Sequence, residues 1–191
     1  MRAAIGIRVK SGWATAVLVA GSIKAPGVAD RRTIELSDPA IPESRQPYHA
    51  GMGRLQTNNA RVARLRKVVV RASNRSVSEL IEGYRRAGHQ VRCVALVVGS
   101  TIDPARISNP HIRAHALEGQ LFRTAVADAA RKSGLSCTVI VERDVYVRAA
   151  KALGRSEDKV KRAVAELGGS LSGRWRADEK KAALAAWLAL T

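Results

Sequence analysis

Cysteines and long apolar segments are scarce in this sequence. The two cysteines among 191 residues, Cys93 and Cys137, each lie inside an apolar run. This placement is typical of small core residues and excludes a disulfide framework or a cysteine-based metal site. No uninterrupted apolar run approaches the roughly 20 residues that a membrane-spanning helix needs. We therefore expect a cytoplasmic protein from a reducing compartment, with no membrane partner.

Three enzyme signatures are also missing. The sequence has no P-loop, no Gly-rich dinucleotide fingerprint and no nucleophile elbow of the hydrolase type. No cofactor is therefore predicted from a local motif.

Acidic residues are few. The sequence has 33 Lys and Arg but only 16 Asp and Glu, which gives a formal charge of +17 and a sequence pI near 11.1. Such a field attracts polyanions, so nucleic acid is the first partner to expect. The alternative is that an Arg-rich and Ala-rich genome inflates the pI. The length and the hydrophobic content of 46% fit one globular domain, residues 1–191.

Two apolar-rich runs meet at residues 10–12 and predict a strand, a tight turn and a returning strand. Side chains alternate between the two faces of the first strand, with Ile5, Ile7 and Val9 on one face and Ala4, Gly6, Arg8 and Lys10 on the other. We expect this hairpin to be the central pair of a sheet, with Arg8 facing a site.

The remaining pattern alternates between strands and helices. The predicted elements are a loop over 23–30, a strand over 31–36, a broken segment over 37–53, a helix from 54 to about 88 with a second start at Ser76, a buried strand over 90–99, a helix over 110–132, a strand over 137–142, and helices over 145–153, from Ser156 and over 177–190. This order predicts an α/β fold with a five-stranded mixed sheet. Three N-terminal strands are antiparallel, two are parallel, helices cover both faces, and the helices of residues 145–191 pack on the sheet.

Three stretches resemble the ribonuclease H-like superfamily, and in particular its Holliday-junction resolvases. Gly6-Ile7-Arg8 is similar to the Gly-Ile-Asp that ends the family's first strand. Residues 154–164 are similar to the resolvases' lysine-bearing helix, and residues 177–186 to their closing Asp-Ala-Ala-Asp-Ala-Leu-Ala helix. The resemblance implies a ribonuclease H-like fold and a nucleic-acid substrate.

The acidic positions of that family are degenerate in this chain. Arg8 stands where the family has Asp, and Lys181 stands where the second acid of the closing helix belongs, whereas Asp178 fits the first acid. The fourth strand ends in Gly99-Ser100, where family members commonly present Glu.

Family enzymes use two Mg²⁺ or Mn²⁺ ions, which need several converging carboxylates. Arg8 and Lys181 would repel such ions, so we expect ordinary two-metal nuclease activity to be lost. If the chain is a nuclease, its cofactor would be Mg²⁺ or Mn²⁺. The candidate catalytic residues are then Asp178, Glu142 and Glu118.

A second polar group opens the predicted helix over 110–132. At helical spacing His111, His115 and Glu118 share the core-facing stripe, near the strand ends where open sheets build ligand sites. Such residues could bind a transition metal, with His49 approaching from the broken segment. The alternative is that His115 and Glu118 hydrogen-bond each other or nearby backbone, and that His111 is an exposed helix-start residue.

Six bases and no acid lie between Arg61 and Arg75. The bases that share one flank of the predicted helix are Arg61, Arg64, Lys67, Arg71 and Arg75. Charges spaced along one line suit a phosphate backbone, so these five residues and Arg8 are the predicted nucleic-acid contacts. The alternative is a solvated helix face, although such faces usually interleave Glu.

Three functional hypotheses follow. The first is a ribonuclease H-like, nucleic-acid-binding protein without the two-metal site. The second is an active metal-dependent nuclease that uses a relocated set drawn from His111, His115, Glu118, Glu142 and Asp178. The third is a structural or homo-oligomeric module whose basic face binds an acidic protein.

Overall fold

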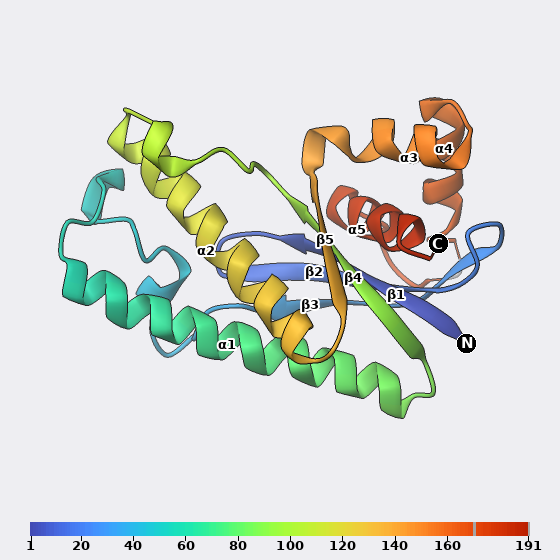
Figure 1. The fold of residues 1–191 in the computed structure, drawn as a ribbon, viewed down its shortest axis with the longest axis horizontal. Coiled ribbons are helices and arrows are strands. Elements are labelled where there is room, and N and C mark those ends of the chain that lie inside the picture. Colours follow the sequence, from blue (N-terminus) through green and yellow to red (C-terminus); the bar gives the residue numbers. More distant parts are fainter. Residues whose placement is uncertain (170, 191) are drawn as a thin grey trace.

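The computed structural model describes residues 1–169 and 171–190 (Figure 1). Its strands form one mixed sheet in the order β3-β2-β1-β4-β5. They are β1 (Arg2–Val9), β2 (Trp13–Gly21), β3 (Pro26–Glu35), β4 (Gln90–Val98) and β5 (Ser136–Val141). β1 pairs antiparallel with β2, and β2 with β3, whereas β4 runs parallel to both β1 and β5. The predicted five-stranded mixed sheet, with the opening hairpin at its centre, is confirmed.

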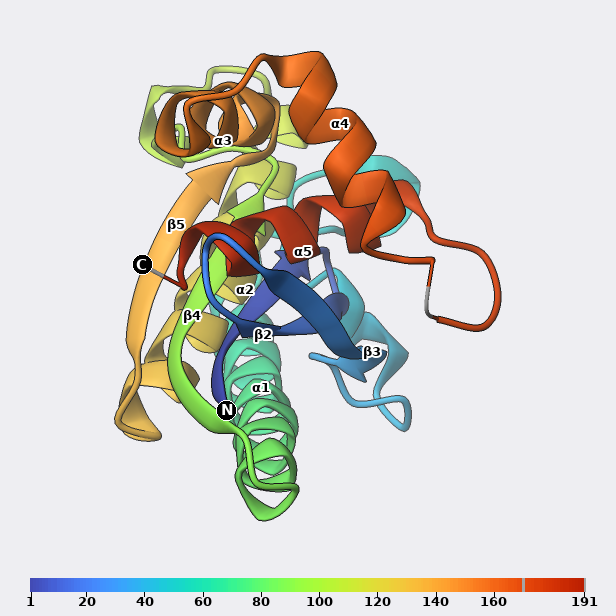
Figure 2. The same ribbon diagram turned by 90° about the vertical axis from the view of Figure 1, so that its right-hand side faces the viewer.

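Helices cover both faces of this sheet, as predicted. They are α1 (Asn59–Arg86), α2 (Pro110–Lys132), α3 (Val145–Leu153), α4 (Glu157–Glu166) and α5 (Ala177–Leu188). Figure 2 shows α1 and α2 on one face and the other three on the opposite face, with α5 lying directly on the strands. α5 packs against β1, β2 and β4, and α3 and α4 pack against α5. No helix in the described part of the chain is both long and apolar enough to cross a membrane.

The alternation along β1 divides the apolar side chains between two cores. Ile5 and Ile7 are fully buried on the side of α1 and α2, whereas Ala4 packs on the side of α5. Gly6 lets α5 come very close to the strand, because a Cβ atom at this position would lie 1.7 Å from the carbonyl oxygen of Ala182. Gly6 therefore allows the middle of α5 to lie directly against β1.

The predicted loop over 23–30 is wrong for residues 26–30, which belong to β3. The turn is shorter, and the Ala25 amide donates to the Ser22 carbonyl across it. Pro26 is tolerated because β3 is an edge strand, where a missing N–H breaks no ladder on the open side.

The predicted second helix start at Ser76 is also wrong. α1 begins at Asn59, where the Asn58 side chain accepts a hydrogen bond from the Arg61 amide, and it continues without a break to Arg86. The buried residues Val69 and Val77 keep the apolar stripe in phase across Ser76, so packing outweighs the local capping signature.

Residues 36–58 join β3 to α1, and we call them the connecting segment. It holds two short 3₁₀ turns, Pro42–Arg45 and Gly51–Gly53, and an isolated bridge between His49 and Leu55. The predicted broken segment over 37–53 is confirmed, but it extends to residue 58, so the predicted helix start at 54 is five residues too early. The connecting segment brings His49 to α2.

Candidate functional site

Charged side chains meet where the parallel strands end, and we call them the ion-pair cluster. Its members are Arg8, Lys10, Glu142, Asp178 and Lys181. β1, β4 and β5 run parallel, so their carboxyl ends share one edge of the sheet. Arg8 is near the end of β1 and Glu142 follows β5 directly, while α5 brings its first two turns to the same place.

Arg8 is the centre of this cluster, and only 4% of the residue is exposed. Its guanidinium contacts the Glu142 carboxylate, and its Nε lies 3.6 Å from Oδ1 of Asp178. Its Nη1 donates to the Val9 carbonyl at 2.8 Å. This burial argues against the expected role of Arg8 as a nucleic-acid contact, because its donors face protein groups.

The two acids of the cluster each contact two bases. Besides Arg8, Glu142 contacts the Lys181 ammonium, and Asp178 lies 3.5 Å from Nζ of Lys10. Three bases and two acids leave the cluster with a net charge of +1. Burial alone would raise the pKa of Glu142, but the hydrogen bond from Lys181 and the charge of Arg8 outweigh it and lower that pKa. A divalent cation would have to displace these bases to reach the carboxylates.

The candidate catalytic acids are divided by the fold. Glu142 and Asp178 lie in the ion-pair cluster, whereas Glu118 is fully buried on α2 and contacts histidines. Beside the cluster lies a cavity of about 430 Å³ whose lining includes Arg8, Ser100 and His115. Gly99 and Ser100 at the end of β4 bring no carboxylate to it.

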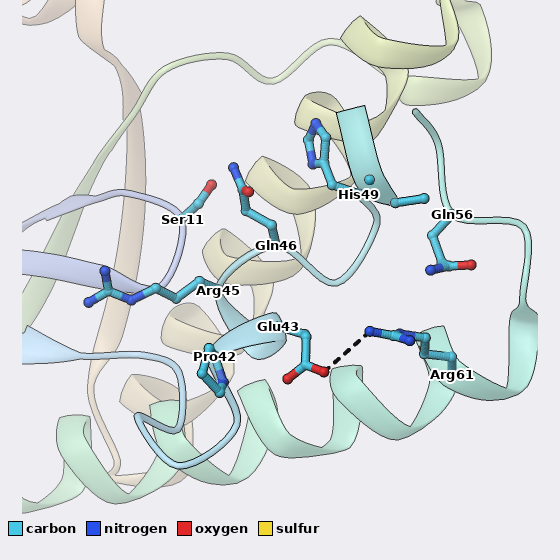
Figure 3. Close-up of a pocket in the computed structure, with 10 residues that line it drawn as sticks. Ser11, Pro42, Glu43, Arg45, Gln46, His49, Gln56 and Arg61 are labelled. Atoms are coloured by element: carbon cyan, nitrogen blue, oxygen red, sulfur yellow. Dashed lines mark hydrogen bonds and ion pairs between the residues drawn. The ribbon is translucent and has the colours of Figure 1, made fainter. Parts of the chain in front are cut away.

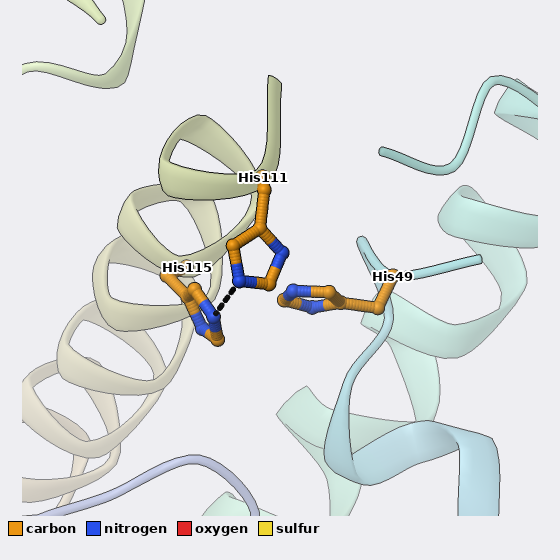
Figure 4. Close-up of side chains that lie close together, drawn as sticks. All are labelled: His49, His111 and His115. Carbon is orange, nitrogen blue, oxygen red and sulfur yellow. Dashed lines mark hydrogen bonds between the residues drawn. The ribbon is translucent and has the colours of Figure 1, made fainter. Parts of the chain in front are cut away.

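The second predicted group is assembled as expected. His111 and His115 project from successive turns of α2 toward His49 of the connecting segment (Figure 4). One ring nitrogen from each lies within 4.8 Å of the others. Glu118 lies beneath them and accepts a hydrogen bond of 2.7 Å from Nδ1 of His49. Its distance of 3.9 Å from His115 is too long for a hydrogen bond, so Glu118 bonds the histidine of the connecting segment.

Burial and charge affect protonation in this histidine cluster. Burial raises the pKa of Glu118, and the hydrogen bond from His49 opposes that shift. Burial and the neighbouring His49 and His111 rings lower the pKa of His115. This shift favours the neutral imidazole, which is the form that binds metals.

The predicted basic flank is exposed along the first half of α1, and we call it the basic surface. Its members are Arg61, Arg64, Lys67, Arg71 and Arg75. Among the described residues, Arg61 alone of these five has an ion-pair partner, Glu43 at 3.3 Å. This pair lies on the wall of a pocket of about 790 Å³ between α1 and the connecting segment (Figure 3). Arg64, Lys67 and Arg71 line a shallow groove on the outer side of α1.

Sequence reasoning missed two glycines that position these groups. Gly6 admits α5 next to β1, and Gly53 has a positive φ of 71° that turns its carbonyl toward His111. A glycine within an apolar strand is a signal of close backbone approach, but only the tertiary structure identifies what approaches.

Neither a family model nor a curated protein sequence matches this chain. Among solved structures, it is similar to RuvC of Thermus thermophilus, at 14% identity and a TM-score of 0.58, over 97% of this chain and 92% of that one. The same protein in complex with Holliday junction substrate gives 14% identity and a TM-score of 0.59, over 98% and 92%.

The yeast mitochondrial Holliday junction resolvase Ydc2 is similar at 10% identity and a TM-score of 0.54, over 98% of this chain and 79% of that one. Identities this low show the fold alone. The chain has the ribonuclease H-like fold of these resolvases, as its sequence predicted.

Proposed function

We propose that this protein binds nucleic acid through the basic surface of α1 and does not cleave it by the two-metal mechanism. The observation that carries the proposal is the ion-pair cluster. At the strand ends Arg8 contacts the carboxylates of both Glu142 and Asp178, and Lys181 contacts that of Glu142. A two-metal site needs those oxygens free to bind hard cations.

The arrangement of the basic surface supports nucleic acid as the partner. Its five bases are distributed over 15 residues of one helix, and the 14 rises between the first and the last span about 21 Å at 1.5 Å per residue. DNA carries about one negative charge per 1.7 Å of helix axis, so a row of this length meets several phosphates. Four of the five bases lack a carboxylate partner within the described residues, and their charge is therefore available to a polyanion. A structure with the same fold is in complex with Holliday junction substrate, which agrees with this class of partner.

The binding test is charge reversal with a matched control. The variant Arg64→Glu, Lys67→Glu, Arg71→Glu changes the net charge by six on α1. The control Lys159→Glu, Lys161→Glu, Arg162→Glu makes the same change on exposed positions of α4, on the opposite face of the sheet. Affinity for a four-way junction, duplex DNA and duplex RNA is measured over a range of salt concentrations.

We expect the wild-type protein and the α4 control to bind with a steep salt dependence. The α1 variant should bind weakly, and the slope of log K against log salt should fall by about 2 to 3 because three phosphate contacts are lost. Equal weakening in both variants would indicate that only the overall charge matters and would contradict the proposed surface.

The cleavage test separates the first proposal from an active nuclease. Wild-type protein is incubated with branched, duplex and single-stranded substrates in Mg²⁺ and then in Mn²⁺, and we expect no cleavage. Cleavage that disappears in Asp178→Asn would show that the cluster opens to bind metal. Cleavage that disappears in His111→Ala would favour the relocated site instead.

A further inference from the structure

Two of the three rings in the histidine cluster, those of His49 and His111, are held as metal ligands usually are. Nδ1 of His111 lies 2.7 Å from the carbonyl oxygen of Gly53, and Nδ1 of His49 lies 2.7 Å from Oε1 of Glu118. A carbonyl and a carboxylate only accept hydrogen bonds here, so each Nδ1 carries the proton. In the neutral form of both rings, Nε2 is then the atom that carries the lone pair. Metal-binding histidines characteristically donate their second N–H to a carboxylate or backbone carbonyl in this way.

One of those nitrogens is buried without a partner. The His49 side chain is 8% exposed, and its Nε2 makes no hydrogen bond within the described residues. A buried imidazole nitrogen that accepts nothing costs free energy unless another group occupies its lone pair. The unpartnered nitrogen indicates that the cluster binds a further group at this position.

The spacing of the other two nitrogens fits a tetrahedral ion. Nε2 of His111 and Nε2 of His115 lie 3.2 Å apart and share a hydrogen bond in the metal-free chain (Figure 4), and this separation is also the one that two ligands of a single ion would have. Two nitrogens at about 2.0–2.1 Å from Zn²⁺, separated by the tetrahedral angle, would lie about 3.3 Å apart. His49 comes from a different segment, and all three ligand atoms already lie within 4.8 Å of one another.

We propose that His49, His111 and His115 bind one Zn²⁺ ion, and that Glu118 and the Gly53 carbonyl position the His49 and His111 rings. Imidazole is a preferred ligand of Zn²⁺, whereas Mg²⁺ prefers oxygen. Glu118 is a positioning residue in this site and not a ligand, because its Oε1 accepts from His49 and the group of ligand atoms that lie within 4.8 Å of one another consists of the three histidines. Its Oε2 is buried without a hydrogen-bond partner among the described residues. The site is separate from the ion-pair cluster and does not depend on nucleic-acid binding.

The ion would fasten the connecting segment to α2. His49 belongs to the segment and the other two ligands to the first two turns of the helix, so one ion joins elements 62 residues or more apart in the sequence. The His111 residue is exposed and the His115 side chain is 52% exposed. The fourth coordination position therefore faces solvent and takes a water molecule or an oxygen of a bound phosphate.

The first experiment measures metal content and affinity in the full chain without an affinity tag, since a histidine tag binds zinc itself. The protein is stripped with a chelator, its fold is checked by circular dichroism, and Zn²⁺ is titrated against a chromophoric competitor. We expect one Zn²⁺ per chain. The variant His111→Ala, His115→Ala should lose it, and the control His89→Ala, at the remaining histidine of the chain, should keep it. A folded wild-type chain that binds no zinc, or equal affinity in the double variant, would overturn the proposal.

The second experiment reports the ligand set without relying on a destabilising variant. Co²⁺ replaces Zn²⁺ in the wild-type protein, and the intense visible bands of a tetrahedral nitrogen-bound ion are expected. Glu118→Gln should retain those bands and weaken zinc binding about 10- to 100-fold, as loss of an outer hydrogen-bond partner does. A weak octahedral spectrum in the wild-type protein would contradict a three-histidine site, and loss of the tetrahedral bands in Glu118→Gln would make Glu118 a ligand.

Discussion

At the scale of single residues, the ion pairs of Glu142 with Arg8 and Lys181 make the stability of the fold depend on pH. The pKa of Glu142 is lowered in the folded chain, so its ionised form stabilises the fold. That contribution is complete above the unfolded-state pKa, about 4.3 for Glu, and is lost as the pH falls through the lower folded-state value.

We therefore expect the free energy of unfolding, measured by urea denaturation, to decrease as the pH falls from 5 to 3. Glu142→Gln should lower stability at pH 7 and flatten this part of the profile. The control Glu79→Gln makes the same chemical change at an exposed position of α1 and should keep the wild-type slope. A profile of Glu142→Gln parallel to that of the wild type would contradict the interpretation.

Residue identities predicted the departures in the cluster but not all of its contacts. Arg8 and Lys181 are visible as bases at acidic positions of the resembling family, and the structure places both against Glu142. That Glu142 would bind both could not be predicted, because the meeting of β5 with α5 is a tertiary contact. The approach of His49 to α2 was expected, whereas the support of His111 by Gly53 depends on the turn geometry of the connecting segment.

At the scale of elements, the connecting segment supports the histidine cluster through a turn at Gly53 that glycine adopts without strain but a residue with a side chain does not. Gly53 has a φ of 71°, and a Cβ atom there would lie 2.9 Å from Nδ1 of His111. Gly53→Ala should therefore destabilise the metal-free protein by about 1–2 kcal/mol and weaken zinc binding at least tenfold. Gly51→Ala is the matched control, because no neighbouring atom lies within 4 Å of its added Cβ and its φ is not positive.

Urea denaturation and zinc titration of the two glycine variants test this. If Gly51→Ala and Gly53→Ala have the same zinc affinity, the turn does not position His111. If Gly53→Ala binds zinc normally but is less stable, the substitution affects folding alone and the proposed role of the Gly53 carbonyl is wrong.

Elements with a strong periodic pattern were predicted closely from the sequence. The bounds of α2 and α3 match the prediction, since the apolar stripe, Pro110 and the glycines after each helix all agree. The pattern failed at β3 and at Ser76. In both places a local signal, Pro26 or a capping sequence, was outweighed by sheet pairing or by burial of the helix face, neither of which is encoded locally.

At the scale of the whole molecule, the order of strands and helices was sufficient to predict the fold, because connection rules leave few arrangements for this succession. The placement of charge was harder to predict from the sequence. A total of +17 says nothing about where the bases gather. The structure separates an exposed row of bases on α1 from a group of bases at the strand ends that is paired with two acids. These two groups have different chemistry although both consist mainly of Arg and Lys.

The proposed histidine site and the paired carboxylates of the ion-pair cluster together predict which metal ions stabilise the whole protein. Zn²⁺ at about 100 times its Kd should add about 2.7 kcal/mol to the free energy of unfolding, a rise in Tm of about 5–10 °C for a chain of this size. Millimolar Mg²⁺ should leave Tm unchanged, because the Glu142 and Asp178 carboxylates already contact bases. Differential scanning calorimetry of the metal-free protein with each ion measures both effects. A rise in Tm with Mg²⁺ that disappears in Glu142→Gln would mean that the ion displaces Arg8 and Lys181. The proposal that this protein lacks a two-metal site would then be wrong.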